Sequence, residues 1–137
     1  MNIDIINKEL NKLINKAKKN NEVPIAALIV YNNEIIAKEY NTVEKDNNIL
    51  SHAEIKAIRS ASKKLNNWRL NNCSLYVTLE PCDMCRQIIK KSRIKKVYYY
   101  IEQNEFKTEN DPSYYKIDDT NNFTNNLKQF FINIRND

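Results

Sequence analysis

The residues of this chain that are suited to chemistry stand in two short segments. The first reads His52-Ala53-Glu54, and the second has Cys82 and Cys85 with two residues between them. Cysteines three positions apart on a helix place both sulfur atoms on the same face. The proline before Cys82 favours the first turn of a helix, where the helix dipole stabilises a thiolate. The spacing therefore predicts two metal ligands at the start of a helix.

His52 is the single histidine of the chain, and we expect it to begin a different helix. If the two helix starts converge, His52, Cys82 and Cys85 give three protein ligands and leave a fourth tetrahedral position for water. That arrangement is typical of catalytic rather than structural zinc, and thiolate and imidazole ligands suit zinc better than magnesium or calcium. Glu54 lies close enough to exchange protons with a zinc-activated water without being a ligand. The pattern predicts one Zn²⁺ per chain, with Glu54 as the catalytic proton shuttle.

Each of these residues has a simpler interpretation when it is taken alone. A single Cys-x-x-Cys can be a redox pair, and a single histidine can be a hydrogen-bonded core residue. Ser51 followed three residues later by Glu54 is also a capping box, which would make Glu54 a helix-start residue only. Cys73 is expected to pack at the edge of a strand rather than to bind a metal. The joint occurrence of the histidine, the glutamate and the two cysteines favours the catalytic zinc site.

The composition limits the class of protein. The net charge is +5, from 22 basic and 17 acidic residues, which permits an anionic partner such as nucleic acid but is also explained by a solvated, lysine-rich surface. With three cysteines and no pattern of a secretory signal, we expect no disulfide framework and a cytoplasmic location. We also expect no membrane span, because no long apolar run occurs in the sequence. Because the chain has no glycine, left-handed turn positions should fall to asparagine or aspartate.

Hydrophobic periodicity predicts alternating helices and strands. Helices are expected over 3–17, 54–65, 82–92 and a final segment with Leu127, Phe130 and Phe131; strands are expected over 23–31, 34–40, 75–79 and 97–101. Asn32-Asn33 should form the two-residue turn of a hairpin, whereas 41–50 should be a loop and 102–124 has no predicted shape. The order predicts an α/β fold with three layers, α/β/α, around a mixed sheet, as one domain over 1–137.

The combined pattern His-x-Glu followed by Pro-Cys-x-x-Cys is typical of zinc deaminases that act on nucleobases. From about Glu22 to Lys96 the chain resembles the bacterial tRNA-specific adenosine deaminases, which have the cytidine deaminase-like fold; the resemblance implies that the mixed central sheet has about five strands. Besides the metal segments, four stretches carry the resemblance: Glu22-Val23-Pro24-Ile25, Trp68-Arg69-Leu70, Leu75 to Cys82 (LYVTLEPC) and Ser92-Arg93-Ile94.

The resemblance implies hydrolytic deamination of adenosine to inosine at wobble position 34 of a tRNA anticodon. It also implies a homodimer and, as substrate, the arginine tRNA with an ACG anticodon. Asn41 matches a family residue that contacts the target base, and Ala53 and Glu54 would line the pocket. Phe130-Phe131 matches a pair in the last helix of the family, although the residues alone predict ordinary core packing.

The chain departs from the family after Tyr100. The family usually has a glycine-containing basic loop there, which helps to hold RNA, whereas residues 101–108 contain no glycine and two glutamates. This departure leaves two other functions open. One is a deaminase of a free base or nucleoside, of the guanine or cytidine type, and the other is a structural-zinc module that binds RNA.

Overall fold

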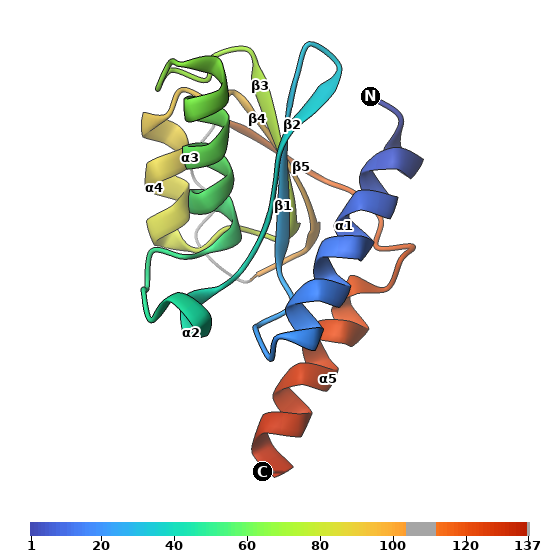
Figure 1. Cartoon of the computed structure of the whole chain (residues 1–137). Helices are drawn as coiled ribbons and strands as arrows, with labels where there is room; N and C mark the ends of the chain where they lie inside the picture. Colours follow the sequence, from blue (N-terminus) through green and yellow to red (C-terminus); the bar gives the residue numbers. More distant parts are fainter. Residues whose placement is uncertain (104–111, 137) are drawn as a thin grey trace.

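The computed structural model of the chain describes residues 1–103 and 112–136. The elements in chain order are α1 (Ile3–Lys19), β1 (Ala26–Tyr31), β2 (Glu34–Tyr40), α2 (Val43–Asp46), α3 (Ala53–Leu65), β3 (Cys73–Leu79), α4 (Asp83–Lys91), β4 (Lys96–Ile101), β5 (Ser113–Lys116) and α5 (Phe123–Asn136). Figure 1 shows the sheet nearly edge-on between two groups of helices.

The five strands form one mixed sheet in the order β2-β1-β3-β4-β5. β1 is antiparallel to β2 and β3, whereas β3, β4 and β5 are parallel. Asn32 and Asn33 connect β1 to β2 with φ angles of 50° and 62°, as a type I′ turn requires. The predicted hairpin and the predicted mixed five-stranded sheet are therefore confirmed.

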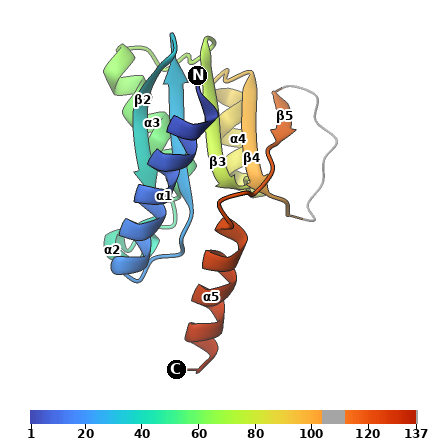
Figure 2. The same cartoon turned by 90° about the vertical axis from the view of Figure 1, so that its right-hand side faces the viewer.

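Helices cover the sheet on both faces, and each face has its own apolar core. Val77 of β3 packs in the core on the side of α3 and α4, with Ala57 and Ile89 of those helices. Leu28 of β1 belongs to the second core, on the side of α1 and α5. Figure 2 shows α1 in front of the sheet and α5 starting at the lower edge of the sheet and running down beyond it. The predicted three-layer fold is confirmed. Within the described ranges, no helix is both long and apolar enough to cross a membrane.

Some element boundaries differ from the predictions. β1 begins at Ala26 rather than at residue 23, because Pro24 has no N–H to offer a neighbouring strand. The predicted loop 41–50 contains the short helix α2. β5 lies in the stretch for which no shape was predicted. It gives little sequence signal, because its four residues form a sheet edge on which Tyr115 is 45% exposed. The chain departs from the family at residues 101–108, and most of this stretch, from residue 104 on, lies outside the described residues.

The absence of glycine has the predicted effect on turns. Seven described residues have positive φ angles, and six of them are asparagines: Asn21, Asn32, Asn33, Asn47, Asn66 and Asn122. Asparagine tolerates the left-handed region better than most residues with a Cβ atom. The seventh is Arg93, with φ 74°, in the turn that follows α4.

Candidate metal centre and pocket

The N-termini of α3 and α4 meet at one end of the molecule. His52 is the N-cap residue of α3 and Cys82 is the N-cap residue of α4; both have extended backbone angles. Cys85 lies in the first turn of α4. The two helices run side by side in the same direction on one face of the sheet, so residues 30 positions apart come together (Figure 1).

Three side chains that can bind a metal converge there. Nδ1 of His52 lies 3.3 Å from Sγ of Cys85 and 3.9 Å from Sγ of Cys82, and all three ligand atoms lie within 4.8 Å of one another. Ligands at roughly 2.0–2.3 Å from a tetrahedral zinc are separated by about 3.6 Å. The separations and the nitrogen and sulfur donors therefore fit a zinc ion. Within the part of the chain that the structure describes, no fourth histidine, cysteine or carboxylate joins this group.

The local environment shifts the pKa values of the two thiols in opposite directions. A hydrogen bond from Cys85, together with the backbone N–H groups of Cys85 and Met84 and the charge of His52, lowers the pKa of Cys82 to about 5. The pKa of Cys85 is raised, because its thiol is hydrogen-bonded to Cys82 and is buried. Cys82 is thus prepared as a thiolate at the start of a helix, as expected for a metal ligand.

Glu54 is buried beside these ligands. Burial raises the pKa of its carboxyl group to about 7, and the charge of Cys82 acts in the same direction. The alternative interpretation as a capping box is wrong. The N-cap residue of α3 is His52 rather than Ser51, and the hydroxyl of Ser51 donates to Asp46 Oδ2 at 2.8 Å instead. A carboxyl group in a pocket whose pKa lies near neutral pH is suited to proton transfer.

A pocket of about 280 Å³ opens beside these side chains. Asn41, Ala53 and Glu54, the three residues predicted to face a substrate, all line it together with His52 and Cys82. The remaining walls are largely apolar: Val23, Ile25, Val43, Ile49 and Leu79, with Glu44, Glu80 and Gln103. Asn41 is 6% exposed, and its side-chain amide has no hydrogen-bond partner among the described residues. That amide is free to bind a ligand.

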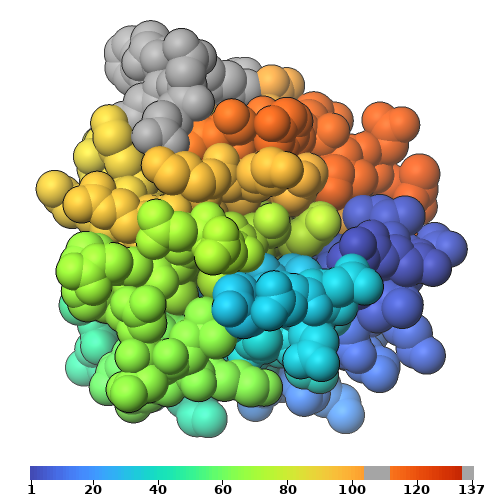
Figure 3. All heavy atoms as spheres, turned by 90° about the horizontal axis from the view of Figure 1, so that it is seen from above, coloured from blue at the N-terminus to red at the C-terminus, as the bar shows by residue number. Residues whose placement is uncertain are grey.

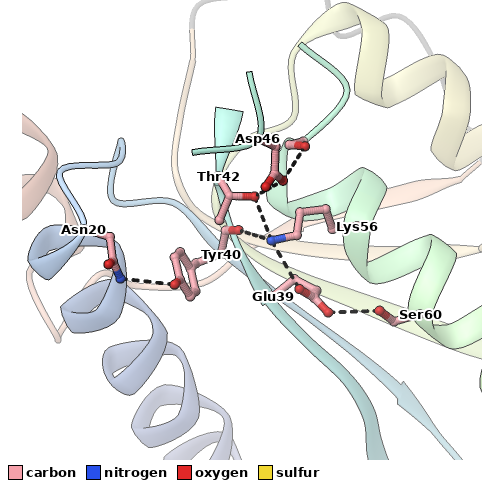
Figure 4. A network of polar contacts seen from close by, with 8 residues as sticks. Asn20, Glu39, Tyr40, Thr42, Asp46, Lys56 and Ser60 are labelled. Carbon is pink, nitrogen blue, oxygen red and sulfur yellow. Dashed lines mark hydrogen bonds and ion pairs between the residues drawn. The ribbon is translucent and has the colours of Figure 1, made fainter. Parts of the chain in front are cut away.

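Lys56 holds the backbone on both sides of Asn41. Its ammonium group donates to the carbonyl oxygen of Tyr40 at 3.1 Å and to Oγ1 of Thr42 at 2.9 Å. It also lies 3.4 Å from Oε1 of Glu39. Figure 4 shows these contacts converging on the lysine from β2 and the following loop. The helix that starts at His52 thus fixes the position of Asn41.

The loop that follows Asn41 is closed at its base. Asp46 Oδ2 accepts hydrogen bonds from Oγ1 of Thr42 at 2.7 Å and from Oγ of Ser51 at 2.8 Å. The backbone N–H of Thr42 also donates to the carbonyl of Ser51 at 3.0 Å. The two hydroxyl groups lower the pKa of Asp46, so its carboxylate stays charged at neutral pH. The closure positions Ser51, and therefore the neighbouring His52.

A buried carboxylate anchors α2 against the pocket. Glu22 is 1% exposed, and its two oxygens accept the backbone N–H groups of Glu44 at 3.1 Å and Lys45 at 2.8 Å. Negative charge is favourable at a helix N-terminus, where N–H groups lack intrahelical partners. Sequence reasoning missed the roles of Glu22 and Lys56. The only available signal for Lys56 was its position one helical turn after His52.

A second buried carboxylate supports the opposite wall. Oε2 of Glu80 lies 2.6 Å from Nη2 of Arg86, and both side chains are buried. Gln103 donates its backbone N–H to Oε1 of Glu80 at 2.9 Å and its side-chain amide to the carbonyl of Glu80 at 2.6 Å. Glu80 therefore joins α4 to the segment after β4 at the rim of the pocket.

Three further residues named from the sequence can be placed. Cys73 is buried at the start of β3 in the core beneath α3, and it is not part of the candidate ligand group. The expectation of core packing for the phenylalanine pair is wrong for Phe131, which is 46% exposed. Phe130 and Phe131 line a hollow of about 490 Å³. Val23 and Glu44 contribute both to this hollow and to the pocket.

Comparison with known protein families gives a match over the whole chain. The sequence profile described as MafB19-like deaminase matches residues 1–137. A tRNA-specific adenosine deaminase of Bacillus subtilis (strain 168) is 46% identical over 92 residues, which are 67% of this chain and 57% of that protein. The chain spans about 55–60% of the length of this and two other tRNA-specific adenosine deaminases, from Buchnera aphidicola and Rickettsia typhi.

Solved structures show the same fold. One, from biochemical and structural studies of A-to-I editing by tRNA:A34 deaminases at the wobble position of transfer RNA, has a TM-score of 0.73 and 31% identity. It covers 80% of this chain, which spans 95% of that one. A guanine deaminase of Bacillus subtilis has a TM-score of 0.69 and 36% identity over 74% of this chain and 66% of its own. Both are deaminases, and they act on different purine substrates.

Proposed function

Since the chain belongs to the MafB19-like deaminase family, we propose that it deaminates adenosine to inosine at wobble position 34 of a tRNA anticodon. The predicted similarity to bacterial tRNA-specific adenosine deaminases is confirmed. One observation carries the proposal. His52, Cys82 and Glu54 line a single pocket, with Cys85 3.3 Å from the histidine. The tRNA substrate is supported by the names of the relatives.

The group of His52, Cys82 and Cys85 can hold a metal ion. We propose that the ion is Zn²⁺, one per chain, on the basis of the donor atoms and their separations. A zinc ion bound there would act as a Lewis acid and would supply hydroxide near neutral pH. The pocket beside the three ligands leaves room for water and for a base.

The residues of the chain have distinct tasks in the proposed reaction. Water adds to the ring carbon that bears the amino group, the carbon–nitrogen bond breaks, and ammonia leaves. Glu54 accepts one proton from the attacking water and gives it to the ring nitrogen; it then takes the second proton from the added hydroxyl group and gives it to the departing amine. Asn41 binds the base through its unpaired amide, and Ala53 gives the base a flat, apolar contact. The apolar walls exclude competing water.

Further parts of the proposal concern the assembly and the cell. We propose that residues 1–137 act as one deaminase domain and that the enzyme works as a homodimer in the cytoplasm, where tRNA is found. The arginine tRNA with an ACG anticodon is the substrate to test first.

A free purine base is the second candidate substrate. The 36% identity to a guanine deaminase favours it, because the same pocket and ligands could serve a free base. The deciding experiment incubates the zinc-loaded protein with the anticodon stem-loop of that arginine tRNA and measures inosine by nuclease digestion and chromatography. A stem-loop with guanosine at position 34 is the matched control. Ammonia released from guanine or cytidine, with no inosine from the stem-loop, would overturn the tRNA proposal.

A further inference from the structure

The turns that follow α3 and α4 form one surface at the end of the molecule opposite the metal centre. Both helices begin at the metal centre and run away from it. α3 has 13 residues, so its far end lies about 20 Å from His52. The turns touch each other there, because the N–H of Leu70 donates to the carbonyl of Ser92 at 2.8 Å. Figure 3 views this end from above and shows the segments after α3 (green) and α4 (gold) side by side.

This surface is strongly basic. We call it the basic end and define it by six exposed residues: Lys64, Trp68, Arg69, Lys91, Arg93 and Lys96. No aspartate or glutamate occurs in residues 62–79 or 84–101, the two stretches from which these side chains come. The turn between β1 and β2 reaches the same end and contributes one acidic residue, Glu34. Among the described residues, the charge at this end is therefore far more positive than the net charge of +5 would suggest.

The helix dipole explains the position of only some of these positive charges. Lys64 and Lys91 lie in the last turns of α3 and α4, where positive charge is favourable to the helix dipole. Arg69, Arg93 and Lys96 lie beyond the helices and gain nothing from that effect. Arg93 is also the one described residue other than asparagine with a positive φ angle. A strained position of this kind is often associated with function.

Trp68 stands between two of these arginines and is 52% exposed. The guanidinium carbon of Arg69 lies 4.4 Å from its ring centroid, and that of Arg93 lies 5.9 Å away. Next to them is a polar hollow of about 160 Å³, whose lining includes Arg69, Asn67 and Asn71. The basic end thus combines cations, amide groups and an accessible aromatic ring.

We propose that the basic end binds the sugar–phosphate backbone of RNA, as a second contact for the substrate about 20 Å from the catalytic pocket. Lysine and arginine neutralise phosphates, amide groups bond to phosphate and sugar oxygens, and an exposed tryptophan stacks on an unpaired base. An anionic membrane is the less suitable partner, because Trp68 is the one large apolar side chain exposed in the two turns and the hollow lined by Arg69 is rich in asparagine. That the RNA is the substrate rests on the proposed function.

The test reverses charges at the basic end and compares RNA binding. The double variant Arg69→Glu/Lys91→Glu carries the same charge change as the control Lys8→Glu/Lys16→Glu, whose exposed lysines lie on α1. Fluorescence anisotropy with a labelled oligouridylate over a range of salt gives the dissociation constant. We expect the test variant to bind about 5- to 10-fold more weakly and the slope of log K against log salt to fall by about 2. Trp68→Ala should weaken binding without changing that slope.

The substrate contact is tested with the same variants. The KM for full-length tRNA should rise several-fold more in Arg69→Glu/Lys91→Glu than the KM for the anticodon stem-loop, while the α1 control changes neither. Equal effects on the two substrates, or oligouridylate binding as tight as in the wild type, would overturn the inference. Salt-sensitive binding to phosphatidylserine vesicles, with none to the oligouridylate, would overturn it in favour of a membrane. If neither RNA is deaminated, the proposed function fails, but the oligouridylate measurement still decides whether this surface binds RNA.

Discussion

Lys56 donates a hydrogen bond to Thr42 over 2.9 Å, and this contact joins the helix of the candidate metal centre to the loop of the candidate base-binding residue. The lysine lies one turn after His52 on α3, and the threonine follows Asn41 directly. The candidate metal ligand His52 and the candidate base-binding amide of Asn41, which belong to different segments, are therefore held in register by one ammonium group. The geometry needed for catalysis depends on residues that touch neither metal nor base.

Replacing Lys56 with methionine should lower deamination without removing the metal. The change keeps the length of the side chain but removes the hydrogen bonds to Tyr40 and Thr42, so Asn41 loses its fixed position. Hydrogen bonds from a charged group contribute about 1.5–3 kcal/mol to stability, and we expect kcat/KM for the stem-loop to fall about 10-fold or more. Lys63→Met on the same helix is the control. Unchanged kcat/KM, with zinc at one per chain in both variants, would show that Lys56 has no positioning role.

Glu22→Gln should destabilise the fold. A glutamine can accept one of the backbone N–H groups of α2, but its own amide group then faces the other, so one buried donor is left unpaired. We expect the free energy of unfolding to fall by about 1.5–3 kcal/mol, measured by urea denaturation. Glu34→Gln, at an exposed position, is the control and should change it by less than about 0.5 kcal/mol. Equal stability of the two variants would contradict an anchoring role for Glu22.

The elements that hold the site were largely predictable, because they depend on local patterns. The periodic apolar residues of α1, the asparagine turn between β1 and β2, and the helix starts at His52 and Cys82 all have signals within a few residues. β5 has four residues at a sheet edge and no buried alternation, so it gives no such signal.

The supports of the site depend on contacts between distant residues. Glu22 bonds to N–H groups 22 and 23 positions away, and nothing in its neighbours indicates this. The two turns of the basic end are also separated by more than 20 residues, and only the parallel course of α3 and α4 joins them. The chemistry of the metal-binding segments can thus be read from their spacing, whereas the residues that orient them cannot.

Replacing Cys85 should lower the zinc content of the protein, whereas replacing Cys73 should not. Cys85→Ala should reduce zinc well below one per chain, because only two of the three proposed ligands, His52 and Cys82, remain. Cys73→Ala is the matched control, since this cysteine is equally buried but packs in the core at the start of β3. It should retain full zinc, as determined by atomic emission on the dialysed protein. Loss of zinc from Cys73→Ala at an unchanged melting temperature would place Cys73 in the ligand set.

Glu54→Gln should separate proton transfer from metal binding. The substitution keeps the size of the side chain in the pocket but removes its ability to accept and return a proton, so kcat for the stem-loop should fall by about 10²–10⁴-fold. Zinc content should stay at about one per chain, because the three proposed ligands, His52, Cys82 and Cys85, are unchanged. The KM should change little, since Asn41 and the apolar walls, which we propose to bind the base, are unchanged. Loss of zinc together with activity would make Glu54 a metal ligand instead, and activity near that of the wild type would require a different proton shuttle.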